Sequence, residues 1–319
     1  MSLFKFPLEI GFYNQKMFKD TVDKLIGERN FDIAFAFFMR TAEYLKNYKI
    51  KKILMAEDCR TVYQERSYKN SKNIFQKFVR WWEFNRLKAY EPEIVNHFDI
   101  TTLVSENDIK SMQEQNPNVK YRLLTNGTDI NKFRIPDDDF SSRKDILFAG
   151  KLDIWANVIM IRDIVKNVFP LVKPEVKDCI LNIAGSKPSS YINSLHSDTI
   201  KIHPDVPDMV TYLQGSRVFI HPHTGGSGIQ NKLLEAMACG CPVVTTPTGI
   251  QGIHATNGED VLIGETAEEL AKQTIRLLED DELAMKISKN GRILIEKTHS
   301  WESVFVALDE IINEAINEE

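Results

Sequence analysis

A glycine-rich loop followed by a lysine and a glutamate is the part of this sequence best suited to chemistry. Residues 224–247 read TGGSGIQNKLLEAMACGCPVVTTP. The loop glycines have no Cβ, so the backbone there can approach a ligand closely. Lys232 and Glu235 are three residues apart and therefore share one face of a helix. A cation at that position suits a phosphate group, and a carboxylate suits the hydroxyls of a sugar.

The loop lies between a predicted strand and a predicted helix. A short apolar strand at 217–221 leads into the loop, a helix runs from the loop to Gly240, and a second strand follows at 242–245. Such a strand–loop–helix–strand unit brings backbone N–H groups and a positive helix N-terminus against an anionic ligand. The residue types equally allow a plain βαβ unit with a flexible loop and a solvated Lys–Glu pair.

The run from Gly228 to Val244 resembles a known donor-binding motif. Retaining glycosyltransferases of the GT-B fold, family 4 (glycosyl transferases group 1), carry it, and the sugar transferases of exopolysaccharide clusters read G-x-Q-N-K-x-L-E-A-M-A-x-G-x-P-V-V. The resemblance implies that the helix N-terminus receives the phosphates and sugar of a nucleotide-sugar and that Glu235 binds the ribose. The wider family has a second Glu eight residues earlier, where this chain has Ser227.

Further landmarks follow the order of that family. They are Phe31-Asp32, Leu103-Val104-Ser105-Glu106, Asn126-Gly127-Thr128-Asp129, Phe148-Ala149-Gly150-Lys151 and Asn182-Ile183-Ala184-Gly185. The family's first strand–turn–helix has no counterpart, so we expect a shortened N-terminal domain. The resemblance implies an α/β, GT-B-like fold with two Rossmann-like parallel-sheet domains facing a cleft, the N-terminal one incomplete.

The alternation of strands and helices independently favours doubly wound parallel sheets. We expect an N-terminal domain at 1–130, a polar linker at 131–142 and a nucleotide-sugar domain at 143–300. By the resemblance, a C-terminal helix at 301–319 crosses back to the first domain. Phe31 to Phe38 is predicted to be a buried strand, and Asn73 to Phe98 a long amphipathic helix.

Composition narrows the class of protein. The chain has 319 residues, is 43% hydrophobic and carries a net charge of −5, which is typical of a globular protein. It contains no run of 18 apolar residues, and its first 13 residues do not read as a signal peptide. We therefore predict a cytoplasmic protein, working at the inner face of the membrane. Cys239 and Cys241 are predicted to pack at a helix–strand junction.

The predicted catalytic residues are Lys151, Lys232 and Glu235. Lys151 follows a strand end, where ligands bind in open α/β sheets, and the resemblance places it on the donor diphosphate. Fixed cations and N–H groups stabilise the charge of a leaving diphosphate. Arg217 is an alternative cation. The predicted donor-binding set is Gly150, Lys151, Asn157, Gly185, His223, Gly226, Ser227, Gly228, Ile229, Gln230, Asn231, Lys232 and Glu235.

No metal or other cofactor is predicted, because the pair His221 and His223 lacks further ligands nearby in the sequence. No catalytic base is assigned, since the resemblance implies that the donor phosphate takes the acceptor proton. Arg40 is a residue that could face the acceptor. Asp58 could contact an acceptor hydroxyl, or it could be an ordinary turn residue.

Residues 66–90 combine seven Lys and Arg with one acid, Glu83, and with aromatic residues that include Trp81, Trp82, Phe75, Phe78 and Tyr90. Nucleic acid is not predicted as a partner, because the domain as a whole is far from basic. A buried helix face and a membrane-surface patch both fit the pattern, and they are compatible.

Taken together, the sequence predicts a hexosyltransferase of the retaining type. It would move a sugar from a nucleoside diphosphate donor, of UDP or GDP type, to a saccharide or lipid-linked acceptor in surface polysaccharide synthesis. Two alternatives stay open: a nucleotide-sugar epimerase, and a non-catalytic nucleotide-sugar-binding partner subunit.

Overall fold

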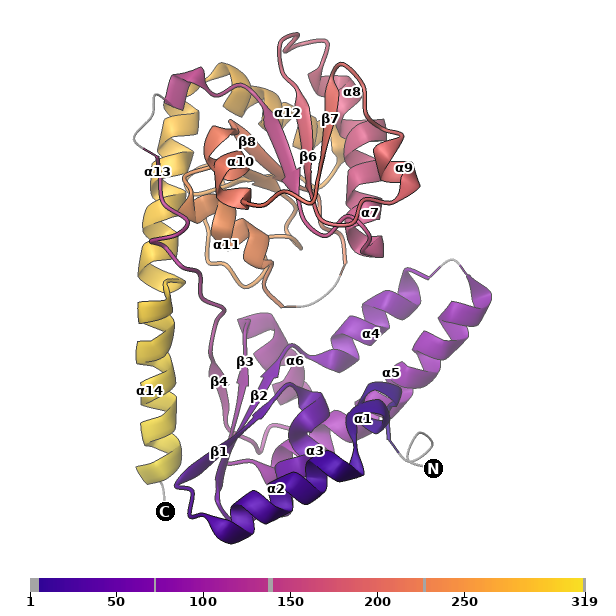
Figure 1. The fold of residues 1–319 in the computed structure, drawn as a ribbon, viewed down its shortest axis with the longest axis vertical. Helices are drawn as coiled ribbons and strands as arrows, with labels where there is room; N and C mark the ends of the chain where they lie inside the picture. The colour runs from indigo at the N-terminus through magenta and orange to yellow at the C-terminus, as the bar shows by residue number, and fades with distance from the viewer. Residues whose placement is uncertain (1–5, 72, 137–139, 226–227, 318–319) are drawn as a thin grey trace. The chain divides into compact units, whose positions relative to one another are not determined.

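A computed structural model describes residues 6–71, 73–136, 140–225 and 228–317. The chain forms two compact units. The first comprises residues up to Thr125, Gly225–Ile229 and the segment from Phe305, and the second comprises Asn126–Thr224 and Gln230–Val304. Each unit is built on one parallel sheet with helices packed against it (Figure 1). The predicted pair of parallel-sheet α/β domains is confirmed.

The sheet of the first unit has four parallel strands in the order β1-β2-β3-β4. The strands are β1 (Ile33–Phe37), β2 (Lys51–Glu57), β3 (Ile100–Leu103) and β4 (Tyr121–Leu123). The helices are α1 (Leu8–Tyr13), α2 (Lys16–Glu28), α3 (Ala42–Leu45), α4 (Arg60–Lys69), α5 (Ile74–Ile94), α6 (Glu106–Gln115) and α14 (Trp301–Asn317). The side chain of Ser105 accepts a hydrogen bond from the N–H of Asp108 and so caps α6.

The predicted burial of β1 is wrong for Phe35 and Phe37. Ala36 is buried, but Phe35 and Phe37 are 39% and 51% exposed. The strand lies at the edge of its sheet, and successive side chains point to opposite faces. An uninterrupted apolar run is typical of a strand covered on both faces, whereas β1 buries only the face that carries Ala36.

Helix α5 holds two other helices in place through buried carboxylates. Glu83 accepts hydrogen bonds from the N–H groups of Leu8 (2.8 Å) and Glu9 (3.3 Å) at the start of α1. Glu91 accepts from the N–H groups of Arg60 (2.7 Å) and Thr61 (2.8 Å) at the start of α4. These bonds satisfy amides that a helix leaves unpaired at its N-terminus. Burial raises the pKa of Glu91 to about 7.

The sheet of the second unit has six parallel strands in the order β10-β9-β8-β5-β6-β7. The strands are β5 (Ile146–Ala149), β6 (Leu181–Gly185), β7 (Ile200–Pro204), β8 (Val218–His221), β9 (Val243–Thr245) and β10 (Leu262–Ile263). The helices are α7 (Trp155–Asp163), α8 (Phe169–Val172), α9 (Ser190–Asn193), α10 (Met209–Gly215), α11 (Asn231–Ala238), α12 (Ala267–Glu279) and α13 (Asp281–Thr298). Phe148 and Ile220 lie in the core beneath these helices.

The junction after α11 is packed as the sequence predicts. Cys239 and Cys241 are buried, and Gly240 between them has a positive φ of 64°. Glycine is favoured at this position after a helix because a side chain would be strained there. A Cβ at Gly240 would also lie 2.9 Å from Ile135 Cγ1.

Among the described residues, we find no helix that is both long enough and apolar enough to span a membrane.

We predict that Glu91→Ala lowers the free energy of unfolding by about 1–3 kcal/mol, because two buried N–H groups lose their acceptor. Glu93→Ala is the matched control, since Glu93 lies on the same helix with its side chain 74% exposed. Urea unfolding of both variants measures the difference. Equal losses in the two variants would show that the Glu91 carboxylate does not hold α4.

Candidate functional site

The centre of the second sheet is where its strand order changes direction. From β5 the chain proceeds to β6 on one side, and β8 later pairs with β5 on the other side, with Ile146 opposite Val218. Ligands of open α/β sheets bind beyond the carboxyl ends of the strands at such a point. Gly150 and Lys151 follow β5 there, and the glycine-rich loop follows β8.

Two glycines let the ends of β5 and β6 come together. A Cβ at Gly185 would lie 1.7 Å from the carbonyl oxygen of Gly150. A Cβ at Gly150 would lie 3.0 Å from both Lys232 Nζ and Asn157 Nδ2. Both glycines have φ near +155°, which other residues rarely adopt. The predicted site residues Gly150 and Gly185 are therefore required by the packing of the site itself.

Three predicted residues converge beside these glycines. Lys232 Nζ donates to Asn157 Oδ1 at 3.0 Å, and Asn157 Nδ2 donates to the carbonyl oxygen of Lys151 at 2.8 Å. Lys232 Nζ also lies 5.6 Å from the centre of the Phe148 ring. The Lys151 side chain is exposed. Asn157 thus links the strand-end loop to α11 and holds the Lys232 ammonium at the end of the sheet.

Burial sets the electrostatics of this cluster. It lowers the pKa of Lys232 to about 8, against the opposing attraction of Glu235. Burial also raises the pKa of Glu235, and the positive charges of Lys132 and Lys232 oppose that rise. A partly desolvated ammonium is a group that gains strongly from an anionic ligand.

Helix α11 presents its N-terminus with the two predicted side chains on one face. Leu233 and Leu234 are buried, while Lys232 and Glu235 lie on the less buried side. Gln230 is the N-cap residue of α11, and its side chain makes no capping hydrogen bond. The Gln230 side chain therefore does not occupy the N–H groups of the first turn, which an anion would need as donors.

Two residues near α11 were not predicted as part of the site. The Asn126 side chain donates to Asn231 Oδ1 at 2.7 Å, and Lys132 contributes positive charge near Glu235. In the sequence, Asn126 belongs to one of the family landmarks, and Lys132 lies in the predicted linker at 131–142. Neither role identifies a contact with α11, which lies some hundred residues further on.

The glycine-rich loop is described only in part. Gly226 and Ser227 lie outside the described residues. Gly228 has φ of 73°, and its N–H donates to Asp108 Oδ2 at 3.3 Å within the first unit. Ile229 is buried. A phosphate bound by the Gly228 N–H would therefore have to displace the Asp108 carboxylate.

The histidines stack at the end of β8. The rings of His221 and His223 lie 5.5 Å apart, and His221 also stacks on Phe148 at 6.4 Å. Burial, followed by the charge of Lys232, lowers the pKa of His221 well below its usual value. Within the described ranges no group of three or more His, Cys, Asp or Glu side chains is placed to hold a metal ion.

The alternative cation and the acceptor-side candidates have other partners. Arg217 is buried at the opposite end of β8, where it pairs with Asp281 and donates to the Leu277 carbonyl at 2.8 Å. It is therefore not a donor-site cation. In the first unit, Asp58 pairs with Arg60 at 3.4 Å. Arg40 stacks on the ring of Phe38 at 4.3 Å.

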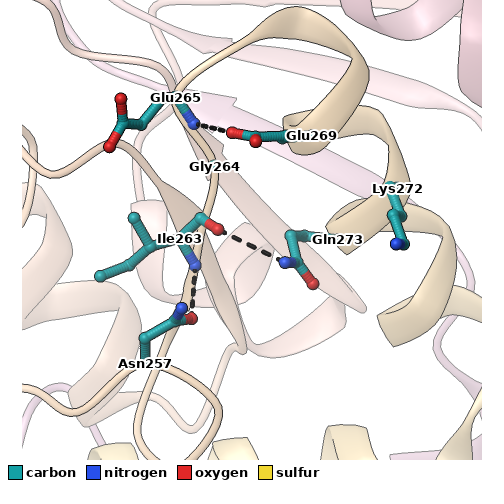
Figure 2. Close-up of a pocket in the computed structure, with 7 residues that line it drawn as sticks. All are labelled: Asn257, Ile263, Gly264, Glu265, Glu269, Lys272 and Gln273. Carbon is teal, nitrogen blue, oxygen red and sulfur yellow. Dashed lines mark hydrogen bonds between the residues drawn. The ribbon is translucent and has the colours of Figure 1, made fainter.

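A pocket of about 360 Å³ lies elsewhere in the second unit, at the start of α12 (Figure 2). Its lining residues are Asn257, Ile263, Gly264, Glu265, Glu269, Lys272 and Gln273. The Glu269 side chain accepts from the N–H of Glu265, and Asn257 accepts from the N–H of Ile263. These polar groups serve the local fold, and no predicted site residue lines the pocket.

Comparison with known families gives a match to the second unit. The family model described as glycosyl transferases group 1 matches residues 143–280. The resemblance to this family is therefore confirmed, and the matched segment contains Lys151, Asn157, Lys232 and Glu235. Over that segment the chain resembles the glycosyl transferases group 1.

Curated relatives are distant and longer. An uncharacterized 44.6 kDa protein in the cps region of Klebsiella pneumoniae is 22% identical over 81% of this chain and 67% of its own length. An uncharacterized glycosyltransferase of Methanocaldococcus jannaschii is 22% identical over 70% of this chain and 57% of its own length. The capsular polysaccharide biosynthesis glycosyltransferase CapM of Staphylococcus aureus is 26% identical over 41% of this chain and 34% of its own length.

Solved structures share the GT-B fold. Sucrose-phosphate synthase from Thermosynechococcus elongatus aligns with a TM-score of 0.70 at 16% identity, covering 93% of this chain and 77% of that protein. HepE of Anabaena, in complex with UDP and glucose, aligns with a TM-score of 0.67 at 14% identity, covering 92% of this chain and 82% of that protein. These similarities establish the fold.

We predict that Lys232→Met flattens the dependence of stability on pH between about 8 and 10.5. The folded pKa of Lys232 is lower than its unfolded value, so in this window the unfolded chain holds a proton that the folded chain has lost. Raising the pH through the window therefore stabilises the wild type. Urea unfolding of wild type and variant at several pH values measures the difference.

The control is Lys151→Met, which removes an exposed ammonium from the same site. It should leave the pH dependence of the wild type unchanged. A wild-type curve that coincides with the Lys232→Met curve would contradict the burial of the Lys232 ammonium.

Proposed function

We propose that this protein is a retaining glycosyltransferase that uses a nucleoside diphosphate-sugar. The observation that carries the proposal is the desolvated Lys232 ammonium, held by Asn157 beside Gly150 at the centre of the second sheet. An ammonium in this state favours a ligand with negative charge. The N-terminus of α11 adds backbone N–H groups with the same preference.

In this account each site residue has a separate task. Lys232 and the exposed Lys151 bind the diphosphate, and they stabilise the charge that develops on it as the sugar leaves. Glu235 accepts hydrogen bonds from the ribose hydroxyls. Asn157 positions Lys232 through the bond at 3.0 Å. Gln230 and Ile229 contribute backbone N–H groups at the start of α11.

Retention follows in this account from attack by the acceptor on the face that the diphosphate leaves. The acceptor hydroxyl loses its proton to a departing phosphate oxygen, so the protein supplies charge and position rather than a base. We assign no metal or other cofactor to the reaction. The donor would be of UDP or GDP type, and the solved complex of HepE with UDP and glucose supports a UDP donor.

The acceptor is proposed to be a saccharide or a lipid-linked sugar of a surface polysaccharide. A relative in a cps region and a capsular polysaccharide biosynthesis glycosyltransferase support this assignment. The proposal includes a cytoplasmic location at the inner face of the membrane, with peripheral contact through residues 66–90, because a lipid-linked acceptor would be presented there. The net excess of cations in that segment supports the contact.

A second candidate is a nucleotide-sugar-binding subunit that works with a catalytic partner. Ser227, in place of the acidic residue that the wider family carries, favours it. Hydrolysis of a UDP- or GDP-sugar in the absence of acceptor separates the two. Slow release of free sugar supports the transferase, and binding without any release supports the subunit.

We predict that one nucleoside diphosphate binds the purified chain and that Lys232→Met and Glu235→Ala each weaken binding about tenfold or more. Each variant removes a charge-assisted contact to the ligand. Calorimetric titration with UDP, GDP and ADP measures the dissociation constants. Glu282→Ala, which removes an exposed acid at the start of α13, is the control and should bind as the wild type does.

Failure of the wild type to bind any of the three nucleotides would overturn the proposed function. Binding that both variants retain at full strength would move the site away from α11.

We also predict that the affinity for the nucleotide falls as the pH rises above about 8, by up to tenfold per pH unit. Deprotonation of Lys232 removes the charge that binds the phosphate. Titrations at a series of pH values should show this fall for the wild type and a flatter profile for Lys232→Met. Parallel profiles would assign the pH dependence to another group.

A further inference from the structure

The first half of α5 exposes large apolar side chains along one face. Ile74, Phe78 and Trp81 follow one another at helical spacing and are 85%, 60% and 44% exposed. Phe75 beside them is 73% exposed. These side chains are therefore not the buried helix face that the sequence allowed. Helices α4 and α5 extend side by side from the sheet of the first unit (Figure 1).

The opposite face of α5 already supplies its packing. Glu83, Leu87, Glu91 and Ile94 are buried there, again at helical spacing. Leu87 and Ile94 are fully enclosed, and the two carboxylates cap α1 and α4. Helix α5 thus packs on the first unit through one face, and its exposed aromatic face can contact another surface.

Cations accompany the exposed aromatics. Lys77 and Lys88 are exposed on the same side of the helix as Phe78, and Arg86 stacks on the Trp82 ring at 4.4 Å. The acid that lies among the cations of residues 66–90 is Glu83, and it points inward to the start of α1. The outward face of this segment is therefore apolar and positively charged, although the whole chain has a net charge of −5.

We propose that this face of α5, formed by Ile74, Phe75, Lys77, Phe78 and Trp81, binds an anionic membrane surface. Aromatic and aliphatic side chains would enter the boundary between headgroups and acyl chains, and the lysines would meet lipid phosphates. The inference deepens the proposed function, on which it rests for the lipid-linked acceptor, by naming the side chains that make the peripheral contact. Its evidence is this face of α5 and not the donor site.

Charge and chemistry favour a membrane over other occupants. In a symmetric dimer through this face, Lys77 and Lys88 of one copy would meet the same lysines of the other, and like charges repel. A nucleic acid would leave Ile74 without an apolar partner, and it would approach a chain of net negative charge. An anionic bilayer pairs with both the cations and the apolar side chains.

Flotation with lipid vesicles tests the proposal. The full chain is mixed with vesicles of phosphatidylcholine alone or with added phosphatidylglycerol. We expect binding to the anionic vesicles, and a fall in partition coefficient of about tenfold or more for Phe75→Ser/Phe78→Ser/Trp81→Ser. Lys77→Gln/Lys88→Gln should lose most of the preference for phosphatidylglycerol and most of the sensitivity to salt.

Matched controls come from α13 of the second unit. Met285→Ser/Ile293→Ser removes apolar side chains that are about half exposed, and Lys289→Gln/Lys297→Gln removes two exposed cations. Both should bind vesicles as the wild type does. Circular dichroism and calorimetry with UDP on the α5 variants show whether they remain folded and keep the donor site.

Equal vesicle binding by wild type and the aromatic variant would overturn the proposal. So would an absence of binding to anionic vesicles, whether or not the chain binds single-stranded RNA or dimerises in sedimentation. If the wild type binds none of UDP, GDP and ADP while vesicle binding follows the expectation, the donor assignment fails and the membrane assignment stands.

Discussion

The close approach of two strand ends is the constraint on which the candidate site depends. The carbonyl oxygen of Gly150 occupies the space that a Cβ at Gly185 would need, and Lys232 and Asn157 occupy the space beside Gly150. With a side chain at Gly185, β5 and β6 could not end together, because its Cβ would clash with the Gly150 carbonyl. A side chain at Gly150 would press on Lys232 and Asn157 and would strain a backbone with φ of 156°. The absence of a Cβ at Gly150 and at Gly185 therefore determines where the Lys232 ammonium can lie.

Buried charges serve different purposes in the two units. In the first unit, Glu83 and Glu91 accept hydrogen bonds from the N–H groups that begin α1 and α4, so their burial is satisfied by the fold. In the second unit, the Lys232 ammonium meets the amide oxygen of Asn157 at the strand end, and burial lowers its pKa. Burial shifts the pKa of Glu91 as well, so it is the partners that separate the two cases: Glu91 accepts from helix N–H groups, whereas Lys232 lies where a ligand would bind.

Local sequence was enough to predict the parts of the site that lie within one strand–loop–helix unit. The glycine loop, Lys232 and Glu235 fall within a dozen residues of each other, and the spacing fixes their common helix face. Asn126, Lys132 and Asp108 come from distant segments, and their contacts arise only when the chain folds. Spacing along the sequence carries no information on such contacts.

Burial was predicted less well than secondary structure. The apolar run at β1 predicts a strand, but it does not say that the strand lies at a sheet edge with Phe35 and Phe37 exposed. In α5 the pattern contains two apolar faces, and only the packing of Leu87 and Ile94 identifies which one is internal. For β1 and α5, the structure shows which face is exposed, and the sequence pattern alone does not.

Hydrogen exchange with and without UDP reports where a nucleotide binds as well as whether it binds. If the donor site lies at α11, exchange slows for the amides at 150–157 and 229–235, at the strand end after β5 and the start of α11. Protection confined to the pocket at 257–273, or no protection anywhere at saturating UDP, UDP-sugar or GDP, would contradict this placement of the donor site.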